Sequence, residues 1–274
     1  MEQRTIAFIG GGNMARSLIS GLINGGHPAE RILVTDLDLD KLAALSDEFG
    51  VQTGSDNTAA ARAADVLVLA IKPQFMAEML EALTRELGSY GDKLVLSIAA
   101  GIQIARLSSL LGGHRNIVRA MPNTPALIGL GMTGLYAPND VSVTDCTFAE
   151  QMLQAVGQTV WVANEAGLNS VIAASGSAPA YFFLFMQLMA EEAERMGFSA
   201  EQARLLVQQT ALGSAQMVIN NPQLDLETLR AQVTSKGGTT AEAVRSFQEQ
   251  GLANLVSEAM RAAVKRAEEM EQLF

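Results

Sequence analysis

A glycine-rich turn near the N-terminus is the clearest chemical signal in this sequence. The apolar run 6–9 leads into GGGNMA at 10–15, and a helical pattern follows at once. A second apolar run ends on Asp36. A G-x-G-x-x-A turn in this setting places a pyrophosphate on a helix N-terminus, and the acid after the second strand binds a ribose hydroxyl. The pattern predicts a bound dinucleotide; the alternative is a glycine turn without a cofactor.

Three further loops are candidate substrate sites. The glycines at 237–238 precede a helix start where Thr239 and Glu242 stand in capping-box register. Free amides and the helix dipole there would hold a carboxylate. The small-residue turn 175–181 and the proline-bracketed loop 121–126 are the other two. Taken alone, the first two loops are better explained by an ordinary turn and helix cap than by a binding site.

The residues needed for nucleophilic or metal catalysis do not form a recognisable pattern. His27 and His114 stand in glycine-rich segments that predict exposed loops, and Cys146 is the only cysteine. No cluster has metal-ligand spacing, and no serine-nucleophile motif is present. Oxidation of an alcohol usually requires a histidine or lysine at the reacting oxygen, whereas a protonated imine accepts hydride without a strong protein acid. The sequence therefore favours imine reduction.

The composition excludes several other classes of protein. The 274 residues include 19 basic and 29 acidic side chains, for a formal net charge of −10, which argues against nucleic acid and anionic membranes as partners. A lone cysteine excludes an intramolecular disulfide and favours a reducing compartment. No apolar run reaches the roughly 18 residues of a membrane span, and no signal-peptide core is evident. We expect a soluble cytoplasmic protein.

Two regions of different periodicity divide the chain. Strand-like runs alternate with helical patterns up to about residue 163, which predicts a mostly parallel sheet covered on both faces, with 66–71 as a central buried strand. The expected strands are 5–9, 31–35, 65–71, 93–98, 116–119, 132–136 and 158–162; the expected helices are 13–24, 38–48, 74–87, 142–155, 178–196, 200–220, 225–233, 240–249 and 251–272. We predict an α/β domain at 1–163 and an all-helical domain at 164–274.

The helix expected at 178–196 leaves almost no polar face over its first three turns. A helix that is apolar all round must be covered on all sides. Because a small helical domain can hardly do this alone, we infer that a second subunit supplies part of the cover. The alternative is a central core helix within one subunit. At the start of the next helix, Ser199 and Gln202 predict a capping box.

Six ordered segments together resemble the pyrroline-5-carboxylate reductase family, and the resemblance covers the whole chain. The segments are FIGGGNMA at 8–15, AIKPQ at 70–74, SIAAG at 97–101, RAMPNTP at 119–125, SGSAPAY at 175–181 and GGTT at 237–240. The resemblance implies reduction of the imine of 1-pyrroline-5-carboxylate to L-proline by NADPH or NADH. It also implies a Rossmann-type domain followed by an all-helical dimerisation domain, a homodimer, and in several members a decamer of five dimers. The active site is then shared between one subunit's cofactor domain and its partner's helices.

The resemblance further implies roles for particular residues. The cofactor-binding positions are Gly10, Gly11, Gly12, Asn13, Met14, Asn57, Ala70, Ile71, Lys72, Pro73, Ala99, Ala100 and Gly101, to which the strand pattern adds Asp36. The substrate-binding positions are Glu165, Ser177, Gly237, Gly238, Thr239 and Thr240. Asn57 would reach the adenosine ribose or its 2′-phosphate, and the loop 99–101 would lie beside the nicotinamide ring. Thr240 is the expected catalytic residue, with its hydroxyl at the ring nitrogen, and no metal is expected.

Some alternatives remain open at this point. Lys236 stands where the family usually has proline, and Ala178 where it often has glycine; Lys236 either adds a positive charge near the substrate or points to solvent. Asp36 favours NADH and the nearest cation is Lys41, whereas the family commonly uses NADPH, so we expect both cofactors to be accepted. The rival functions are reduction of another cyclic imine or a β-hydroxyacid, and non-enzymatic NAD(P) sensing.

Overall fold

The computed structural model describes residues 2–274, which form two compact units. The first unit contains the residues up to Ser177 together with Ala263–Phe274, and the second unit is Ala178–Ala262. These units are defined by packing alone. The functional boundary expected between residues 163 and 164 therefore stays a prediction.

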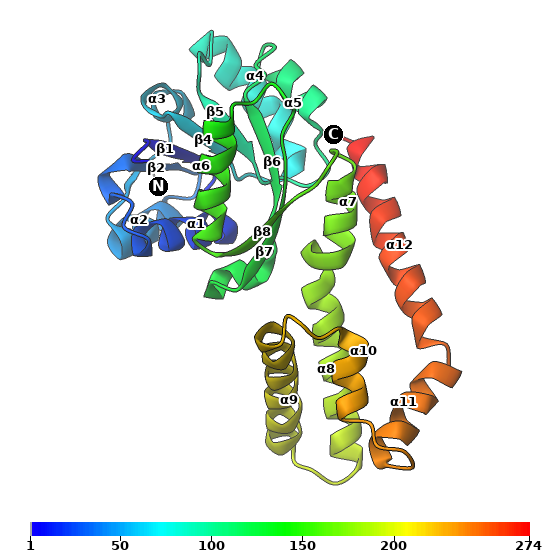
Figure 1. Ribbon diagram of the computed structural model, residues 1–274. Helices are drawn as coiled ribbons and strands as arrows, with labels where there is room; N and C mark the ends of the chain where they lie inside the picture. The colour runs from blue at the N-terminus through cyan, green and yellow to red at the C-terminus, as the bar shows by residue number, and fades with distance from the viewer. Residues whose placement is uncertain (1) are drawn as a thin grey trace. The chain divides into compact units, whose positions relative to one another are not determined.

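The first unit contains a single sheet of eight strands among the described residues, in the order β3-β2-β1-β4-β5-β6-β7-β8 (Figure 1). The strands are β1 Ile6–Ile9, β2 Ile32–Thr35, β3 Gln52–Gly54, β4 Val66–Leu69, β5 Leu94–Ser97, β6 Ile117–Met121, β7 Gly131–Tyr136 and β8 Gly157–Trp161. Neighbouring strands are parallel except β6 and β7, which run antiparallel. The mostly parallel sheet is thus confirmed, and β4 is fully buried near its centre, as expected.

Helices cover both faces of this sheet because successive strand residues point to opposite sides. In β1, Ile6 and Phe8 pack into one apolar layer, and Ala7 and Ile9 pack into the other. The first layer includes side chains of α1 (Asn13–Asn24), α2 (Leu39–Phe49) and α6 (Val143–Gln154); the second includes those of α3 (Asn57–Ala63), α4 (Met76–Leu87) and α5 (Ile104–Leu110). Short 3₁₀ turns lie at Ala29–Arg31, Pro73–Phe75 and Thr124–Ile128.

Every strand and helix expected from the sequence is present, with bounds shifted by at most a few residues. Strand β3 and helices α3, α5 and α7 were not expected. The three residues of β3 are all exposed, so they show no apolar pattern. Helices α3 and α5 have seven residues each, too few for a helical period to stand out.

The second unit is entirely helical among its described residues. Its helices are α8 (Ala178–Arg195), α9 (Ala200–Asn220), α10 (Leu226–Gln232) and α11 (Thr239–Glu249), and α12 (Leu252–Glu271) begins in this unit and ends in the first. Helices α8 and α9 pack side by side (Figure 1). The capping box of Ser199 with Gln202 at the start of α9 is confirmed.

The second unit buries little apolar surface within one chain. Of its described apolar side chains, only those of Ala178, Ala203 and Val207 are buried. The exposed large ones include Phe182, Phe183, Leu184, Phe185, Leu188, Met189, Leu205, Leu206, Leu212, Met217 and Ile219. A soluble monomer rarely exposes so many neighbouring apolar side chains, so this unit has the surface of an interface.

One helical stretch, Gly167–Arg195, is long and apolar enough to cross a membrane by length and composition alone. It comprises α7 (Gly167–Val171), a π-helical turn at Ile172–Gly176 and α8. The sequence pattern did not indicate an apolar run of this length, because the small residues 173–178 interrupt it. The core helix of a soluble protein meets the same criteria of length and composition.

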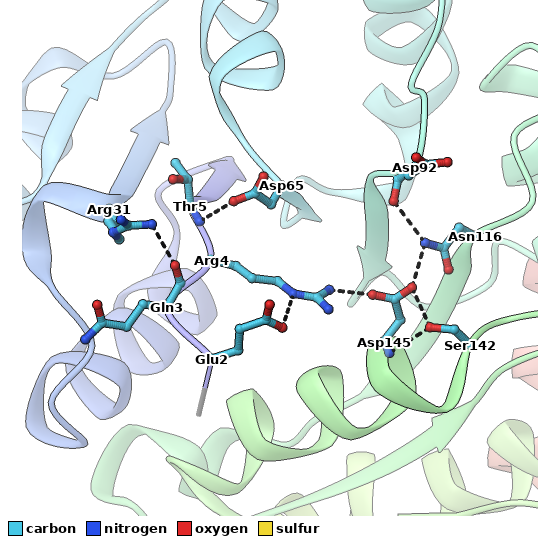
Figure 2. Close-up of polar contacts among 10 residues, drawn as sticks. All are labelled: Glu2, Gln3, Arg4, Thr5, Arg31, Asp65, Asp92, Asn116, Ser142 and Asp145. Atoms are coloured by element: carbon cyan, nitrogen blue, oxygen red, sulfur yellow. Dashed lines mark hydrogen bonds and ion pairs between the residues drawn. The ribbon is translucent and has the colours of Figure 1, made fainter.

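A polar network ties together segments at the amino ends of the strands (Figure 2). Asp145, in the first turn of α6, pairs with Arg4, and it accepts hydrogen bonds from Asn116 Nδ2 at 3.0 Å and Ser142 Oγ at 2.9 Å. The Arg4 guanidinium lies 4.8 Å from the centre of the Phe148 ring. The network therefore fixes the start of β1, the start of β6 and the start of α6 together.

We predict that Asp145→Ala lowers the free energy of unfolding by about 2 kcal/mol, since it removes charged hydrogen bonds from a partly buried site. Burial raises the pKa of Asp145, but the hydrogen bonds from its three partners outweigh burial and the pKa lies below its ordinary value. Its stabilisation is thus present above the unfolded-state pKa and is lost as pH falls through the folded-state pKa. Urea unfolding of the wild-type protein and of Asp145→Ala, at neutral and at acidic pH, measures the difference in the free energy of unfolding.

Asp140→Ala is the matched control, because Asp140 pairs with Arg115 at an exposed position. Its effect should stay below about 1 kcal/mol. Equal effects of the two substitutions, or a difference that does not shrink in acid, would contradict this role of Asp145.

Candidate active site

The glycine turn after β1 is shaped by close contact with the segment that follows the neighbouring strand, β4. Gly10 has a φ of +104°, which side-chain-bearing residues rarely adopt, and a Cβ there would come within 2.7 Å of the Ala70 carbonyl oxygen. The Gly10 amide donates to the Thr35 carbonyl at 2.7 Å. Both the conformation and the space at this position therefore require glycine.

The N-terminus of α1 is well suited to an anion. Gly12 is its N-cap, no side chain caps the helix, and its first turn contains no acid. A Cβ on Gly12 would meet no described atom within 4 Å, so packing within the chain does not explain the glycine. Ala15 in the first turn is fully buried against the sheet. These residues fit a dinucleotide pyrophosphate, which needs free amides and close access to the backbone.

Asp36, directly after β2, is held by the backbone of the turn. Its Oδ2 accepts from the Gly11 amide at 2.8 Å and its Oδ1 from the Asp38 amide at 3.0 Å, while Lys41 Nζ lies 4.0 Å from Oδ1. The carboxylate thus lies beside the glycine turn, as a ribose-binding acid would. Its contact with a ribose stays a prediction.

The structure brings most of the expected cofactor residues to one edge of the sheet. The Ala70 amide donates to the Ile9 carbonyl at 2.9 Å, which places the start of the 70–73 segment beside the glycine turn. The loop 99–101 follows β5, the next parallel strand, so it leaves the same edge. Asn57, the first residue of α3, follows β3 at the far end of the sheet order. Strands β1 and β4 are adjacent, and their following helices cover opposite faces, which is the point of an open α/β sheet where ligands bind.

Glu165 and Ser177 have local partners within the first unit. Glu165 Oε1 accepts from Arg119 Nη1 and from the Ile104 amide, each at 2.7 Å. The Ser177 amide donates to the Ile172 carbonyl at 2.8 Å at the end of the π-helical turn. Substrate binding by either residue stays a prediction.

Two polar residues of the 119–125 motif, Arg119 and Asn123, hold the surrounding segments together. Arg119 is buried in β6 beside Glu165. Asn123 donates to the Ser175 carbonyl at 3.2 Å and to Ser175 Oγ at 3.1 Å, and its Oδ1 accepts from the Met132 amide at 2.9 Å. A charged residue inside an apolar strand was the available signal for Arg119, because such a charge needs a buried partner.

The glycine–threonine loop of the second unit ends in an uncapped helix start. Gly237 has a φ of +73°, and the Gly238 amide donates to the Ser235 carbonyl at 3.0 Å to close the turn. Gly238, not Thr239, is the N-cap of α11, and no side chain caps the helix. The capping box expected for Thr239 and Glu242 is therefore wrong: Thr239 is already helical, and its side chain does not accept from the first turn.

This correction makes the loop better suited to an anion. With glycine at the N-cap, no side chain of the loop accepts from the amides of Thr239, Thr240 and Ala241, which begin α11. Thr239, Thr240 and Lys236 are exposed within the chain. Amides at the start of an eleven-residue helix suit a small carboxylate.

The histidines are less exposed than the sequence suggested. His27 is buried, and its burial lowers its pKa. His114 is half-buried; its Nε2 lies 2.9 Å from the Lys93 carbonyl oxygen, its ring packs on Tyr90, and burial again lowers the pKa. Gly26 and Gly113, the glycines before the two histidines, have positive φ angles, and the turns they form place both histidine rings against the domain instead of in solvent. Among residues 2–274, no three His, Cys, Asp or Glu side chains are grouped as a metal site would require.

A surface hollow of about 830 Å³ lies at the opposite edge of the sheet and is lined by Arg4, Asp65, Tyr90 and Lys93, among others. Ligands of open α/β sheets bind beyond the carboxyl ends of the strands. The hollow adjoins the amino ends, so we place the candidate active site at the glycine turn instead.

The comparisons with known proteins agree with this geometry. Residues 165–270 match the family model "Pyrroline-5-carboxylate reductase dimerisation", and residues 5–101 match "NADP oxidoreductase coenzyme F420-dependent". A curated pyrroline-5-carboxylate reductase of Vibrio alginolyticus is 54% identical over all of both chains.

Two solved structures extend the similarity to three dimensions. A pyrroline-5-carboxylate reductase from Coxiella burnetii has 42% identity and a TM-score of 0.92, covering 98% of this chain and 99% of that one. The Plasmodium falciparum enzyme, solved with NADP bound, has 28% identity and a TM-score of 0.86, covering 99% of each chain. The resemblance inferred from six motifs is confirmed, and the chain belongs to the pyrroline-5-carboxylate reductase family.

Proposed function

We propose that this protein reduces the imine of 1-pyrroline-5-carboxylate to L-proline with NAD(P)H. The observation that supports it most directly is the pair of uncapped helix starts, one after the Gly10–Gly12 turn and one after Gly237-Gly238. The first suits a pyrophosphate and the second a small carboxylate. Full-length similarity to reductases of this name supports the same conclusion.

The division of roles follows from what each segment offers. When bound, the reduced nicotinamide supplies a hydride from its C4 to the imine carbon. The amides of Thr239 and Thr240 hold the substrate carboxylate, and the Thr240 hydroxyl donates a hydrogen bond to the lone pair that forms on the ring nitrogen as the hydride adds to carbon. The nitrogen is protonated before the transfer, so the product is an amine that takes its last proton from water. No histidine or metal is needed, since the protein chiefly orients the reactants.

Turnover of pyrroline-5-carboxylate, followed at the nicotinamide absorbance, is the direct test. Steady oxidation of NAD(P)H with this substrate supports the proposal. Turnover only with another cyclic imine or with a β-hydroxyacid would identify a related reductase. Cofactor binding without any turnover would identify a sensor of NAD(P).

Self-association is expected because the second unit matches a dimerisation family and exposes its apolar helices. We propose a homodimer formed through α8 and its neighbours, and a further assembly of five dimers. An interface of this kind also accounts for the apolar stretch Gly167–Arg195, so we propose a cytoplasmic protein with neither membrane nor nucleic-acid partners.

We predict that Thr240→Ala lowers kcat about ten- to hundredfold, which is the effect of losing one donor at the reacting group. NADH and NADPH dissociation constants should change less than twofold, because the cofactor is held by the other unit. Thr240→Ser keeps the hydroxyl and should recover most of the activity. A parallel loss of cofactor affinity, or a serine variant as impaired as the alanine variant, would contradict the assignment.

Cofactor preference provides a second prediction. Asp36 lies beside Asp38, and Lys41 is the only cation among residues 36–41, so a 2′-phosphate there meets mostly negative charge. We expect both cofactors to be used, and we expect Asp36→Ser to raise the kcat/KM ratio of NADPH to NADH about tenfold. Asp40→Ser, on the exposed side of the same segment, is the control and should change the ratio little. An unchanged ratio in Asp36→Ser would remove Asp36 from cofactor selection.

The dimer provides a third prediction. Replacing both Phe182 and Phe183 by Glu should dissociate the assembly, because it places charge on the exposed apolar face of α8. Val143→Glu, at an 82% exposed apolar position on α6, is the control and should leave the assembly intact. Sedimentation velocity measures both. An unchanged mass for the double variant would show that α8 lies outside the interface.

A further inference from the structure

A buried arginine connects the C-terminal turn of α12 with the loop that follows β5. Arg119, in β6, has only 3% of its side chain exposed. Its Nη1 donates to Glu165 Oε1 at 2.7 Å, and Glu271 Oε1 lies 4.0 Å from the same nitrogen. The three charges come from segments far apart in the sequence, and all of them belong to the first unit.

Both glutamates also hold the end of the loop 98–104. Glu165 Oε1 accepts from the Ile104 amide at 2.7 Å, at the first residue of α5. Glu271 Oε2 accepts from Gln103 Nε2 at 2.9 Å, and Gln103 is the N-cap of α5. Glu165 therefore satisfies one backbone amide of a helix start that has no side-chain cap of its own, while Glu271 holds the side chain of its N-cap residue. The negative charge of both acids suits the helix dipole.

The same loop is in contact with the backbone of α12. Gly101 has a φ of +75°, and a Cβ on it would come within 2.9 Å of Met270 Cβ. After α12 the chain stays on this surface, where Arg106 Nε donates to the Phe274 carbonyl at 2.9 Å. The loop is thus fixed at Gly101 by packing against Met270, and at 103–104 by hydrogen bonds to the two carboxylates.

The stability of α12 does not explain the position of Glu271. The last turn of α12 contains no basic residue, and an acid at a helix C-terminus is unfavourable. The Glu271 side chain is only 8% exposed, and its Oε1 has no hydrogen-bond partner among the described residues. Burial of this carboxylate is compensated by the Arg119 charge and by the start of α5, both of which lie at the loop.

We propose that Glu271 and Arg119 are positioning residues that fix the loop 98–104 against the nicotinamide ring. The proposal rests on the proposed function, which places Ala99 to Gly101 beside that ring. Hydride transfer depends steeply on the placement of the reacting atoms, so a loop displaced by about 1 Å costs up to about a hundredfold in rate. Overall cofactor affinity, which comes mainly from the pyrophosphate and adenosine contacts, depends on it much less.

The test uses Glu271 because removing the fully buried Arg119 would destabilise the whole unit. Glu271→Ala should raise hydrogen exchange of the amides in 98–104 in the full-length protein, with and without NADPH. It should lower kcat about tenfold and raise the primary isotope effect from C4-deuterated NADPH, while the dissociation constant of NADPH stays within twofold. Glu271→Gln keeps an oxygen that can accept from Gln103. Its hydrogen exchange, kcat and isotope effect should therefore lie between those of the wild-type protein and those of Glu271→Ala.

Glu269→Ala is the matched control, because Glu269 lies on the same helix turn and pairs with Arg266 at the surface. It should leave exchange, kcat and the isotope effect unchanged. Faster exchange in Glu271→Ala with unchanged kcat and isotope effect would overturn the positioning role, as would unchanged exchange in 98–104. Failure of the proposed function has a different signature, namely a wild-type protein that binds NADPH but does not turn over the substrate.

Discussion

The contact between Gly10 and Ala70, just after β4, is the constraint on which the cofactor half of the candidate site depends. The chain must leave β1 with a φ of +104° while passing within contact distance of Ala70. This turn directs α1 to one face of the sheet, whereas the helix after β4 covers the other face. The uncapped amides at the start of α1 and the hydrogen bond that holds Asp36 both belong to the same turn.

The second unit depends on a different constraint, which one chain cannot satisfy. Its buried apolar side chains are two alanines and one valine, while phenylalanines and leucines along α8 are exposed. Burial of apolar area is the main favourable term in folding, so these helices need a second surface to be stable. The exposed apolar helices therefore agree with the self-association expected of a dimerisation family. The Gly237-Gly238 loop lies in this unit as well.

Most of the fold could be predicted from the sequence because long periodic segments and glycine turns are local signals. The α/β region, the order of its strands along the chain, and the long helices from 178 onward follow from period and turn residues alone. Short elements such as β3 and α5 could not be predicted, because neighbouring segments hold them in place. The capping pattern at Thr239 was misleading, since Gly238 already supplies the extended N-cap conformation. His27 was expected in solvent because its glycine neighbours predict a loop, but not the direction that the loop takes.

The charged cluster at Arg119 could not be predicted for a deeper reason. Its partners, Glu165 and Glu271, lie 46 and 152 positions further along the chain, and no local pattern pairs them. Only folding brings the three together, and the burial of Arg119 then makes each partner necessary. Helix α12 begins in the unit that must assemble and ends at the loop after β5. The loop after β5 is thus held by the last turn of a helix whose first residues belong to the other unit.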